Sequence, residues 1–155
     1  MKIEKIDITD VMWQQLIEYA EVCSWIAGKS LAIAMRDNGF EDWEGVFVAM
    51  SNDKIVGYCT VNKSDCIPNV NYSPYISFVF VDENFRGNRI SEKLILCASE
   101  YLSQVGFYQV YIVSGELGLY EKYGFHVIDA QMAVYGKRAQ IFMKKIRTFC
   151  NTKDL

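Results

Sequence analysis

The chain has 155 residues, of which 51% are hydrophobic and 23% charged, and its formal net charge is −3. This apolar fraction is enough for a real core and excludes intrinsic disorder, and the length fits one domain. The slightly acidic balance argues against a general nucleic-acid binder, because such proteins are usually basic.

The cysteines and the single histidine, His126, argue against a structural metal site. The chain has five cysteines, none of them in a C-x-x-C pair: Cys23, Cys59, Cys66, Cys97 and Cys150. A structural zinc site needs closer Cys and His spacing. An odd cysteine count without a signal peptide indicates a reducing compartment, and no apolar run reaches the ~18 residues of a membrane span. We therefore expect a cytoplasmic protein with no metal and no membrane partner.

The first part of the chain reads as a strand, two helices and a hairpin. Alternating residues predict an edge strand, and Thr9 or Asp10 can cap the helix that follows. Gly28 is expected to divide that helix from the next one. Ser51 to Lys54 form the turn of a hairpin. The expected elements are a strand at 2–8, a helix from Val11, a second helix ending at 38–39, and strands at 46–50 and 55–61.

The second part alternates strands and helices after a long loop. A strand, a helix and a strand of these lengths normally make a parallel pair with a right-handed crossover. Gly106 is expected to stop the long helix, and Gly124 suits a left-handed cap of the short one. The expected elements are a loop at 62–74, a strand at 75–81, a helix to residue 105, a strand at 108–113, a short helix at 116–123, and strands at 125–128 and 139–146. The order predicts a mixed sheet flanked by helices.

The most informative segment is the turn between the strand at 75–81 and the long helix. It reads Arg86-Gly87-Asn88-Arg89-Ile90-Ser91 and opens an amphipathic helix. A turn of this kind presents backbone N–H groups at a helix N-terminus, and its two arginines can add charge-assisted hydrogen bonds. The segment therefore predicts an anion site, and a phosphate is the anion that suits it best.

Two segments together resemble the GNAT acetyltransferase superfamily, over roughly residues 1–146. The family's central motif is Q/R-x-x-G-x-G/A. Arg86 fits its first position, Arg89 stands where the first glycine is expected, and Ser91 replaces the second small residue. Further on, the run from Leu119 to Phe125 resembles the family's L-Y-E-K-x-G-F pattern.

The resemblance implies a fold class and the range of residues that the domain covers. The fold is of the mixed α/β (α+β) class, with a central mixed, mostly antiparallel sheet of about six or seven strands flanked by about four helices. We expect a single N-acetyltransferase domain over residues 1–155, the last ~8 of which form a loose tail.

The resemblance also implies acetyl-coenzyme A as co-substrate. Its pyrophosphate would lie on N–H groups of the turn, and its pantetheine arm would pair with the preceding strand. The implied cofactor-binding residues are Val79, Phe80, Val81, Arg86, Gly87, Asn88, Arg89, Ile90 and Ser91. Glycine serves where backbone must approach a ligand. An arginine in a first helical turn is expected to meet no dihedral obstacle, so the Arg89 side chain can swing outward toward a phosphate.

Tyr120 matches the family position whose hydroxyl protonates the departing thiolate. A phenol of pKa ~10 is protonated at pH 7 and lies near the pKa of a thiol, so the role is chemically sensible. The alternative is that Tyr120 and Tyr123 only pack the short helix. No general base stands out among four candidates: Asp65, Glu83, Glu116 and His126. No cysteine falls at a matched catalytic position, which favours direct transfer in a ternary complex.

The acceptor is expected to enter beside residues 22–45 and 62–75. Aromatic faces and nearby carboxylates there suit an amine cation, although a core role for Trp43 is equally open. The candidate lining residues are Trp25, Trp43, Tyr72 and Tyr75, with Asp42 and Glu44 beside them.

The sequence thus predicts transfer of an acetyl group to a primary amine of a small molecule or peptide. Two other readings stay open. One is a non-catalytic acyl-coenzyme A sensor or interaction module with the same fold, and the other is a small interaction domain without a ligand. Small members of the family often pair, so a homodimer also stays open.

Overall fold

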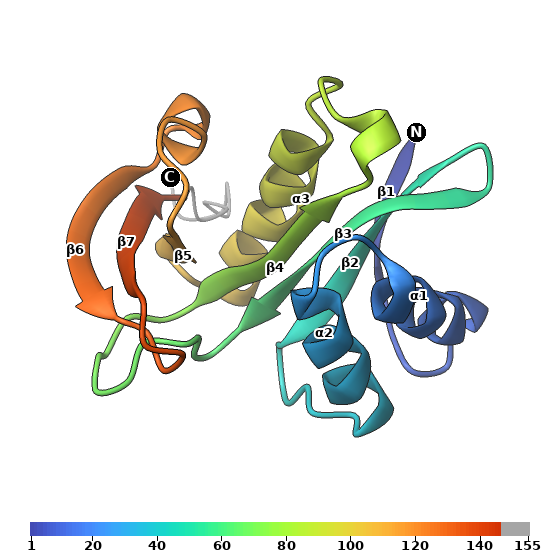
Figure 1. Cartoon of the computed structure of the whole chain (residues 1–155), viewed down its shortest axis with the longest axis horizontal. Helices are drawn as coiled ribbons and strands as arrows, with labels where there is room; N and C mark the ends of the chain where they lie inside the picture. The colour runs from blue at the N-terminus through green and yellow to red at the C-terminus, as the bar shows by residue number, and fades with distance from the viewer. Residues whose placement is uncertain (147–155) are drawn as a thin grey trace, which may run out of the picture. The chain divides into compact units, whose positions relative to one another are not determined.

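The computed structural model describes residues 1–146, which contain a seven-stranded sheet and three α-helices (Figure 1). The elements are β1 (Lys2–Ile6), α1 (Val11–Val22), α2 (Ala27–Arg36), β2 (Gly45–Ser51), β3 (Lys54–Asn62), β4 (Tyr75–Val81), η1 (Glu83–Phe85), α3 (Ile90–Val105), β5 (Gln109–Ser114), η2 (Tyr120–Tyr123), β6 (His126–Met132) and β7 (Arg138–Lys145), where η1 and η2 are 3-10 helices. Cys150 and the expected tail lie outside the described residues.

The strands follow the order β1-β2-β3-β4-β5-β7-β6. The pairs β1–β2, β2–β3, β5–β7 and β6–β7 are antiparallel, and β4 pairs with β5 in parallel at Tyr75 and Tyr111. This confirms the mixed, mostly antiparallel sheet and the parallel strand–helix–strand unit. It also confirms that the first strand is an edge strand.

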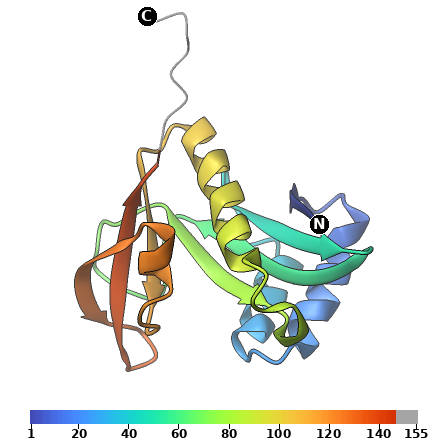
Figure 2. The same ribbon diagram turned by 90° about the horizontal axis from the view of Figure 1, so that it is seen from above.

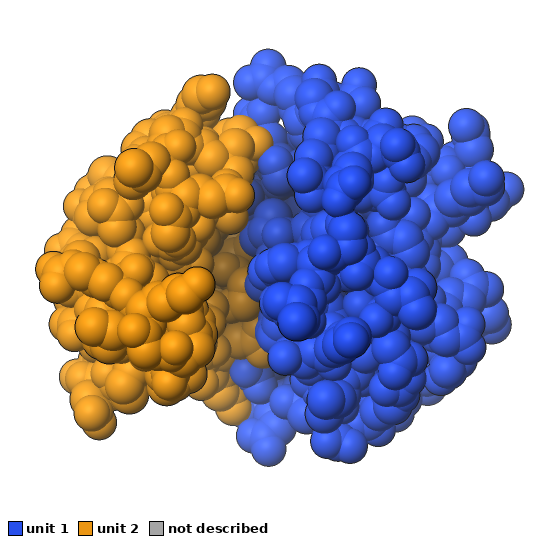
Figure 3. All heavy atoms as spheres, in the orientation of Figure 1, with its two compact units in different colours: residues 1–61, 78–98 blue, residues 62–77, 99–155 orange. Residues whose placement is uncertain are grey.

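The chain forms two compact units (Figure 3). Unit 1 consists of residues 1–61 and 78–98, and unit 2 of residues 62–77 and those from 99 onward. Both β4 and α3 contribute residues to each unit. The single domain over residues 1–155 remains a prediction.

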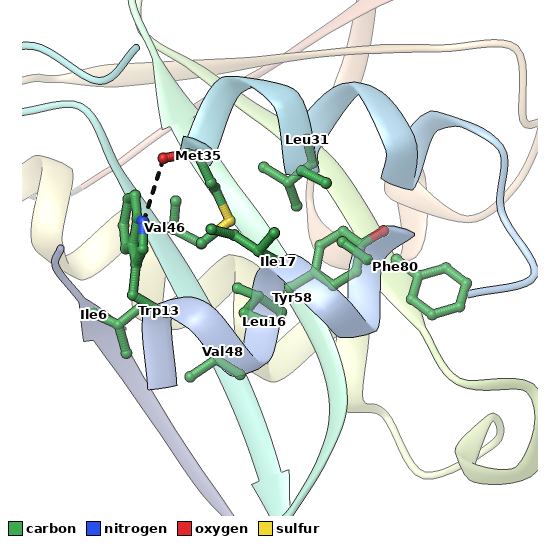
Figure 4. Close-up of a cluster of buried hydrophobic side chains, with 12 residues drawn as sticks. Ile6, Trp13, Leu16, Ile17, Leu31, Met35, Val46, Val48, Tyr58 and Phe80 are labelled. Atoms are coloured by element: carbon green, nitrogen blue, oxygen red, sulfur yellow. Dashed lines mark hydrogen bonds between the residues drawn. The ribbon is translucent and has the colours of Figure 1, made fainter. Parts of the chain in front are cut away.

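In unit 1, α1 and α2 cover one face of the sheet, and the first turns of α3 cover the other (Figure 2). The cluster beneath α1 and α2 is apolar, and the Trp13 indole N–H donates to the carbonyl of Met35 across 3.3 Å (Figure 4). On the α3 side, the Cys59 thiol lies 3.9 Å from the carbonyl of Leu94. The cluster's largest buried members include Trp13, Leu16, Leu31, Met35 and Tyr58.

The break between α1 and α2 falls at residues 23–26, so the expectation that Gly28 divides the helices is wrong. Gly28 lies inside α2, where a Cβ atom would overlap the Ala20 carbonyl oxygen and come within 2.7 Å of Cys23 Sγ. The glycine therefore permits a close approach of two helices. Sequence patterns favour a helix stop at such a residue because they do not register what packs against it.

Two local predictions, the hairpin turn between β2 and β3 and the cap of α1, fared differently. The hairpin between β2 and β3 is confirmed, and Asn52 and Asp53 have φ of 49° and 62°, as a type I′ turn requires. Asp10 is the N-cap of α1, as expected, but its side chain does not cap the helix. Instead, the Asp10 carboxylate accepts from the backbone N–H of Asp7 at 2.8 Å.

Unit 2 is built around the antiparallel ladder of β5, β7 and β6. The loop at residues 63–74 joins this ladder, because the Val134 N–H donates to the Cys66 carbonyl at 2.8 Å. Their shared core contains the buried residues Ile67, Tyr75, Tyr111, Ala133, Ala139 and Ile141.

The expected helix at 116–123 is a helix only at Tyr120–Tyr123, as a single 3-10 turn. Gly118 has φ of 83°, a left-handed conformation that a continuous helix cannot contain. Glu116 therefore does not open a helix, and its N–H donates to Ser114 Oγ at 3.0 Å. The end of the turn is as predicted, because Gly124 caps it with φ of 90°.

Candidate functional site

The turn before α3 has the backbone of an anion-binding nest. Gly87 and Arg89 have φ of 84° and 59° and flank Asn88. Alternating right- and left-handed residues turn successive N–H groups toward one concave side, which attracts an anion. The 16-residue helix α3 begins at Ile90, and the first N–H groups of a helix have no intrahelical acceptor. The turn and the helix end thus present backbone N–H groups of unit 1 in an arrangement that can hold an anion, and the anion site itself remains a prediction.

Side chains fix the shape of this turn. The Asn88 side-chain amide donates to the Phe85 carbonyl at 3.0 Å, and Arg86 Nε donates to the Val81 carbonyl at 3.2 Å. Asp82 caps η1 by accepting from the N–H of Asn84 at 2.9 Å. The turn is therefore preorganised by bonds from its own side chains, which reduces the entropy lost when a ligand binds.

Arg89 corrects one expectation. Its φ of 59° lies in the left-handed region, so the prediction that arginine meets no dihedral obstacle is wrong. A residue with a Cβ pays about 1–2 kcal/mol in this conformation, which explains why glycine suits the position. The side chain does point outward: it is 77% exposed, and Nε donates to Glu92 Oε2 at 2.7 Å.

The middle of β4 carries a feature that the sequence does not reveal. Phe78 has φ of 50°, which is rare for a bulky residue and marks a local strain. Phe80 is 5% exposed, and its ring stacks on those of Tyr58 and Trp25 at 5.3 and 6.1 Å. Val79 and Val81 are half-buried. An irregularity of this kind within a strand re-aims the backbone groups that follow it.

Asp82 has a second role that sequence reasoning missed. Tyr19 of α1 donates its hydroxyl to Asp82 Oδ2 at 3.2 Å. Burial, followed by the Asp82 charge, raises the pKa of Tyr19, so the phenol keeps its proton at neutral pH. The bond ties α1 to the start of η1, just before the turn at residues 86–91. An aspartate just before a helical turn is a capping signal in sequence, but its distant partner is not readable there.

Tyr120 lies in unit 2, whereas the turn lies in unit 1. The Tyr120 side chain is 7% exposed and packs against Phe142, Phe125 and Tyr123 with ring centroids 5.6, 6.3 and 6.3 Å away. These contacts demonstrate a packing role. The role of the hydroxyl as an acid remains a prediction.

The four candidate bases lie in different surroundings. Glu83, Glu116 and His126 are exposed. Asp65 is half-buried and accepts from Ser77 Oγ at 2.5 Å and from the Cys66 N–H at 2.6 Å. The structure favours none of these residues as a base.

The expected acceptor residues divide between the two units. In unit 1, Trp25 is part of the aromatic stack on Phe80, and Glu44 accepts from the N–H of Glu41 at 3.1 Å. Trp43 is half-buried and Asp42 is exposed. Tyr72 and Tyr75 belong to unit 2.

Among residues 1–146, no group of three or more His, Cys, Asp and Glu side chains is placed to hold a metal ion. Within the same range, no helix has the length and apolar character to cross a membrane.

The chain resembles several solved acetyltransferases in fold. An aminoglycoside 6′-N-acetyltransferase from Enterococcus faecium is 17% identical, with a TM-score of 0.73 over 94% of this chain and 97% of that one. An aminoglycoside 6′-N-acetyltransferase solved with coenzyme A is 16% identical, with the same TM-score and coverage. A ribosomal-protein-alanine N-acetyltransferase from Brucella melitensis is 18% identical, with a TM-score of 0.62 over 94% and 100%.

No curated protein matches the chain in sequence. The sequence model of the acetyltransferase (GNAT) family matches residues 10–125, a range that includes both the turn at residues 86–91 and Tyr120. This match spans most of the chain and agrees with the fold, so the chain belongs to the acetyltransferase (GNAT) family.

Proposed function

We propose that the protein transfers an acetyl group from acetyl-coenzyme A to a primary amine of a small molecule or peptide, directly within a ternary complex. The observation that carries this proposal is the nest at Gly87–Arg89 opening onto α3 in a chain of this family. Its geometry suits a pyrophosphate, the group that the donor would present there.

Cofactor binding is assigned to the turn and the end of β4. The N–H groups from Gly87 to Ser91 would hold the pyrophosphate, each contact with the helix end contributing ~0.3–1 kcal/mol. Arg86 adds positive charge beside the pyrophosphate. Arg89 does the same if its guanidinium leaves Glu92, with which it is paired, and binds a phosphate instead. Backbone groups of Val79, Phe80 and Val81 would pair with the pantetheine arm. Binding of coenzyme A by a protein of similar fold supports this assignment.

The chemistry requires a neutral amine, a stabilised oxyanion and a protonated leaving group. At pH 7, deprotonating an amine of pKa ~10.4 costs ~4.6 kcal/mol, so a base or a water chain must take the proton. The amine nitrogen then bonds to the thioester carbon, and a backbone N–H near Val81 stabilises the oxyanion. As the carbon–sulfur bond breaks, the Tyr120 hydroxyl donates its proton to the thiolate. The nitrogen of the new amide releases its extra proton to water, and the Tyr120 phenolate regains a proton from water before the next turnover.

The neighbours of similar fold include enzymes named for aminoglycosides and for a ribosomal-protein alanine. They therefore support both small-molecule and peptide amines as acceptors for this chain. A second candidate function, a non-catalytic acyl-coenzyme A sensor, is favoured by one observation: Tyr120 is almost fully buried among aromatic rings.

The test is a calorimetric titration with acetyl-coenzyme A and with coenzyme A lacking its 3′-phosphate, followed by a thiol-release assay with an amine panel. We expect micromolar binding and amine-dependent thiol release. Arg86→Ala should weaken binding, more strongly at low salt, while Arg36→Ala, which removes an exposed arginine on α2, serves as the matched control. Binding without turnover on any amine would favour the sensor, and no binding at millimolar cofactor would refute both.

A further inference from the structure

A buried tyrosine hydroxyl in unit 2 has no hydrogen-bond partner within residues 1–146. Tyr75 is 1% exposed, and its hydroxyl oxygen is buried and unpartnered. Such a group loses the hydrogen bonds that it makes to water in the unfolded chain and gains none on folding, so its retention needs an explanation. Burial raises the pKa of Tyr75 to about 12, which keeps the phenol protonated at neutral pH.

Asp65 lies on the same face of β4 as Tyr75, because Ser77, two residues further along the strand, donates to its carboxylate. Its charge, after burial, also raises the pKa of Tyr75. The Asp65 carboxylate is held by Ser77 Oγ at 2.5 Å and by the Cys66 N–H at 2.6 Å. A carboxylate has about four lone-pair sites, so two such bonds leave it able to accept from a ligand.

A second carboxylate, Asp129 on β6, is held in the same way. Tyr72 donates its hydroxyl to Asp129 Oδ2 at 3.0 Å, Gln131 Nε2 donates to Oδ2 at 3.1 Å, and the Ala130 N–H donates to Oδ1 at 2.7 Å. These bonds, and the charge of Arg138, lower the pKa of Asp129, so it is ionised at neutral pH.

Tyrosine rings link the two carboxylates. The Tyr111 ring centroid lies 5.0 Å from that of Tyr72 and 6.0 Å from that of Tyr75. Aromatic faces and carboxylates together are the groups that attract an ammonium ion. We call these five residues the tyrosine–aspartate cluster: Asp65, Tyr72, Tyr75, Tyr111 and Asp129.

We propose that the tyrosine–aspartate cluster binds the ammonium groups of a cationic acceptor, and that the Tyr75 hydroxyl gains its missing partner from that acceptor. This inference rests on the proposed function and narrows its acceptor to a polycationic amine. Ile67 of the loop at residues 63–74 packs in the same buried cluster as Tyr75, so the proposal requires this loop to shift when the acceptor binds. The carboxylates expected from sequence, Asp42 and Glu44, lie instead in unit 1.

The test measures amine binding directly, so that it does not depend on turnover. Spermidine, kanamycin and lysine amide are each titrated calorimetrically into the full chain, with and without coenzyme A. We expect at least one to bind, Asp65→Asn and Asp129→Asn to raise its Kd about tenfold or more, and Tyr75→Phe about fivefold. Glu100→Gln, an equal charge change at an exposed position on α3, is the matched control and should leave Kd unchanged.

Each outcome has one meaning. If none of the three amines binds while coenzyme A does, or if the cluster variants bind an amine like the wild type, the inference is overturned and the proposed function stands. If coenzyme A fails to bind but an amine binds in a cluster-dependent way, the proposed function fails and the amine site remains. Tyr75→Phe keeps the ring, so it tests the hydroxyl even if an aspartate variant does not fold. If the Tyr75 hydroxyl has only a structural role, Tyr75→Phe should be more stable than the wild type and bind the amine with the same Kd.

Discussion

Arg89 combines two properties that oppose each other in one residue. Its backbone occupies a conformation that suits glycine, while its guanidinium adds positive charge to a proposed phosphate site. The exposed pair with Glu92 contributes little to stability, because such pairs are worth about 0–1 kcal/mol. The residue therefore trades backbone strain for charge.

Comparing two substitutions separates these effects. Both Arg89→Gly and Arg89→Ala remove the charge, but only glycine relieves the left-handed backbone. We expect the glycine variant to be more stable than the alanine variant by about 1 kcal/mol in urea unfolding. Both should bind acetyl-coenzyme A less tightly than the wild type. Equal stability of the two variants would show that residue 89 does not hold a left-handed conformation in solution.

The Tyr120 hydroxyl can be tested apart from the ring's packing. Tyr120→Phe keeps the contacts with Phe142 and Phe125 while removing the proton donor. We expect turnover to fall about tenfold or more, with the Kd for acetyl-coenzyme A nearly unchanged. Tyr123→Phe, in the same 3-10 turn, is the control and should leave turnover unchanged. Equal turnover of wild type and Tyr120→Phe would remove Tyr120 from the mechanism.

At the scale of elements, the contact of α1 with α2 depends on Gly28. Gly28→Ala would gain up to about 1 kcal/mol of helix propensity, but it places a Cβ atom against the Ala20 carbonyl oxygen. Overpacking of this kind costs about 1–3 kcal/mol or more, so we expect a net loss of ~1–2 kcal/mol in chemical unfolding. Gly39→Ala, whose Cβ would meet an atom at 3.5 Å, is the control and should change stability little. A Gly28→Ala protein as stable as the wild type would mean that the two helices lie further apart.

Elements with strong local signals are the ones that the sequence predicted well. The strand at 75–81 matches β4, and glycines end α3 and η2 where expected. The errors occurred where packing overrides local preference, as at Gly28, or where a left-handed glycine interrupts a helical pattern, as at Gly118.

In the candidate site, too, local features were predictable from the sequence and tertiary contacts were not. The turn that opens α3 was predictable because it is built from contiguous residues, while its role as a phosphate site remains a prediction. The conformation of Phe78 was not, because nothing in a phenylalanine signals a positive φ. The pairing of Tyr72 with Asp129 was also hidden, since these residues are 57 positions apart in sequence. The chemistry of a contiguous segment can be predicted from a sequence, whereas the residues that pack against it from elsewhere in the chain cannot.

For the molecule as a whole, buried phenols and thiols predict sensitivity to alkali. Burial is the main reason why the pKa values of Tyr19, Tyr58 and Tyr75 are raised, that of Tyr75 to about 12. Burial also raises the pKa of Cys66, to about 11. Above pH ~10 the unfolded chain releases these protons while the folded chain keeps them, so the free energy of unfolding falls as pH rises. The stabilisation is fully present below the unfolded pKa values and declines between pH ~9 and 12.

The measurement is the urea midpoint at pH 8 and at pH 11. We expect a lower midpoint at pH 11 and a smaller drop for Tyr75→Phe, which lacks one of the raised groups. An unchanged midpoint at pH 11 would show that these side chains reach solvent in the folded protein.

The position of β7 within unit 2 has a consequence for biosynthesis. β7 lies between β5 and β6 in the sheet, yet it leaves the ribosome after both. Until it arrives, the backbone edges that it will occupy are open to pairing with other chains. A nascent chain halted near residue 137 therefore carries two unfilled strand edges, and we expect truncation there to give an aggregating product. Among residues 1–146, the strand made last completes the middle of this ladder, so the sheet of unit 2 cannot be completed before residue 145 has been synthesised.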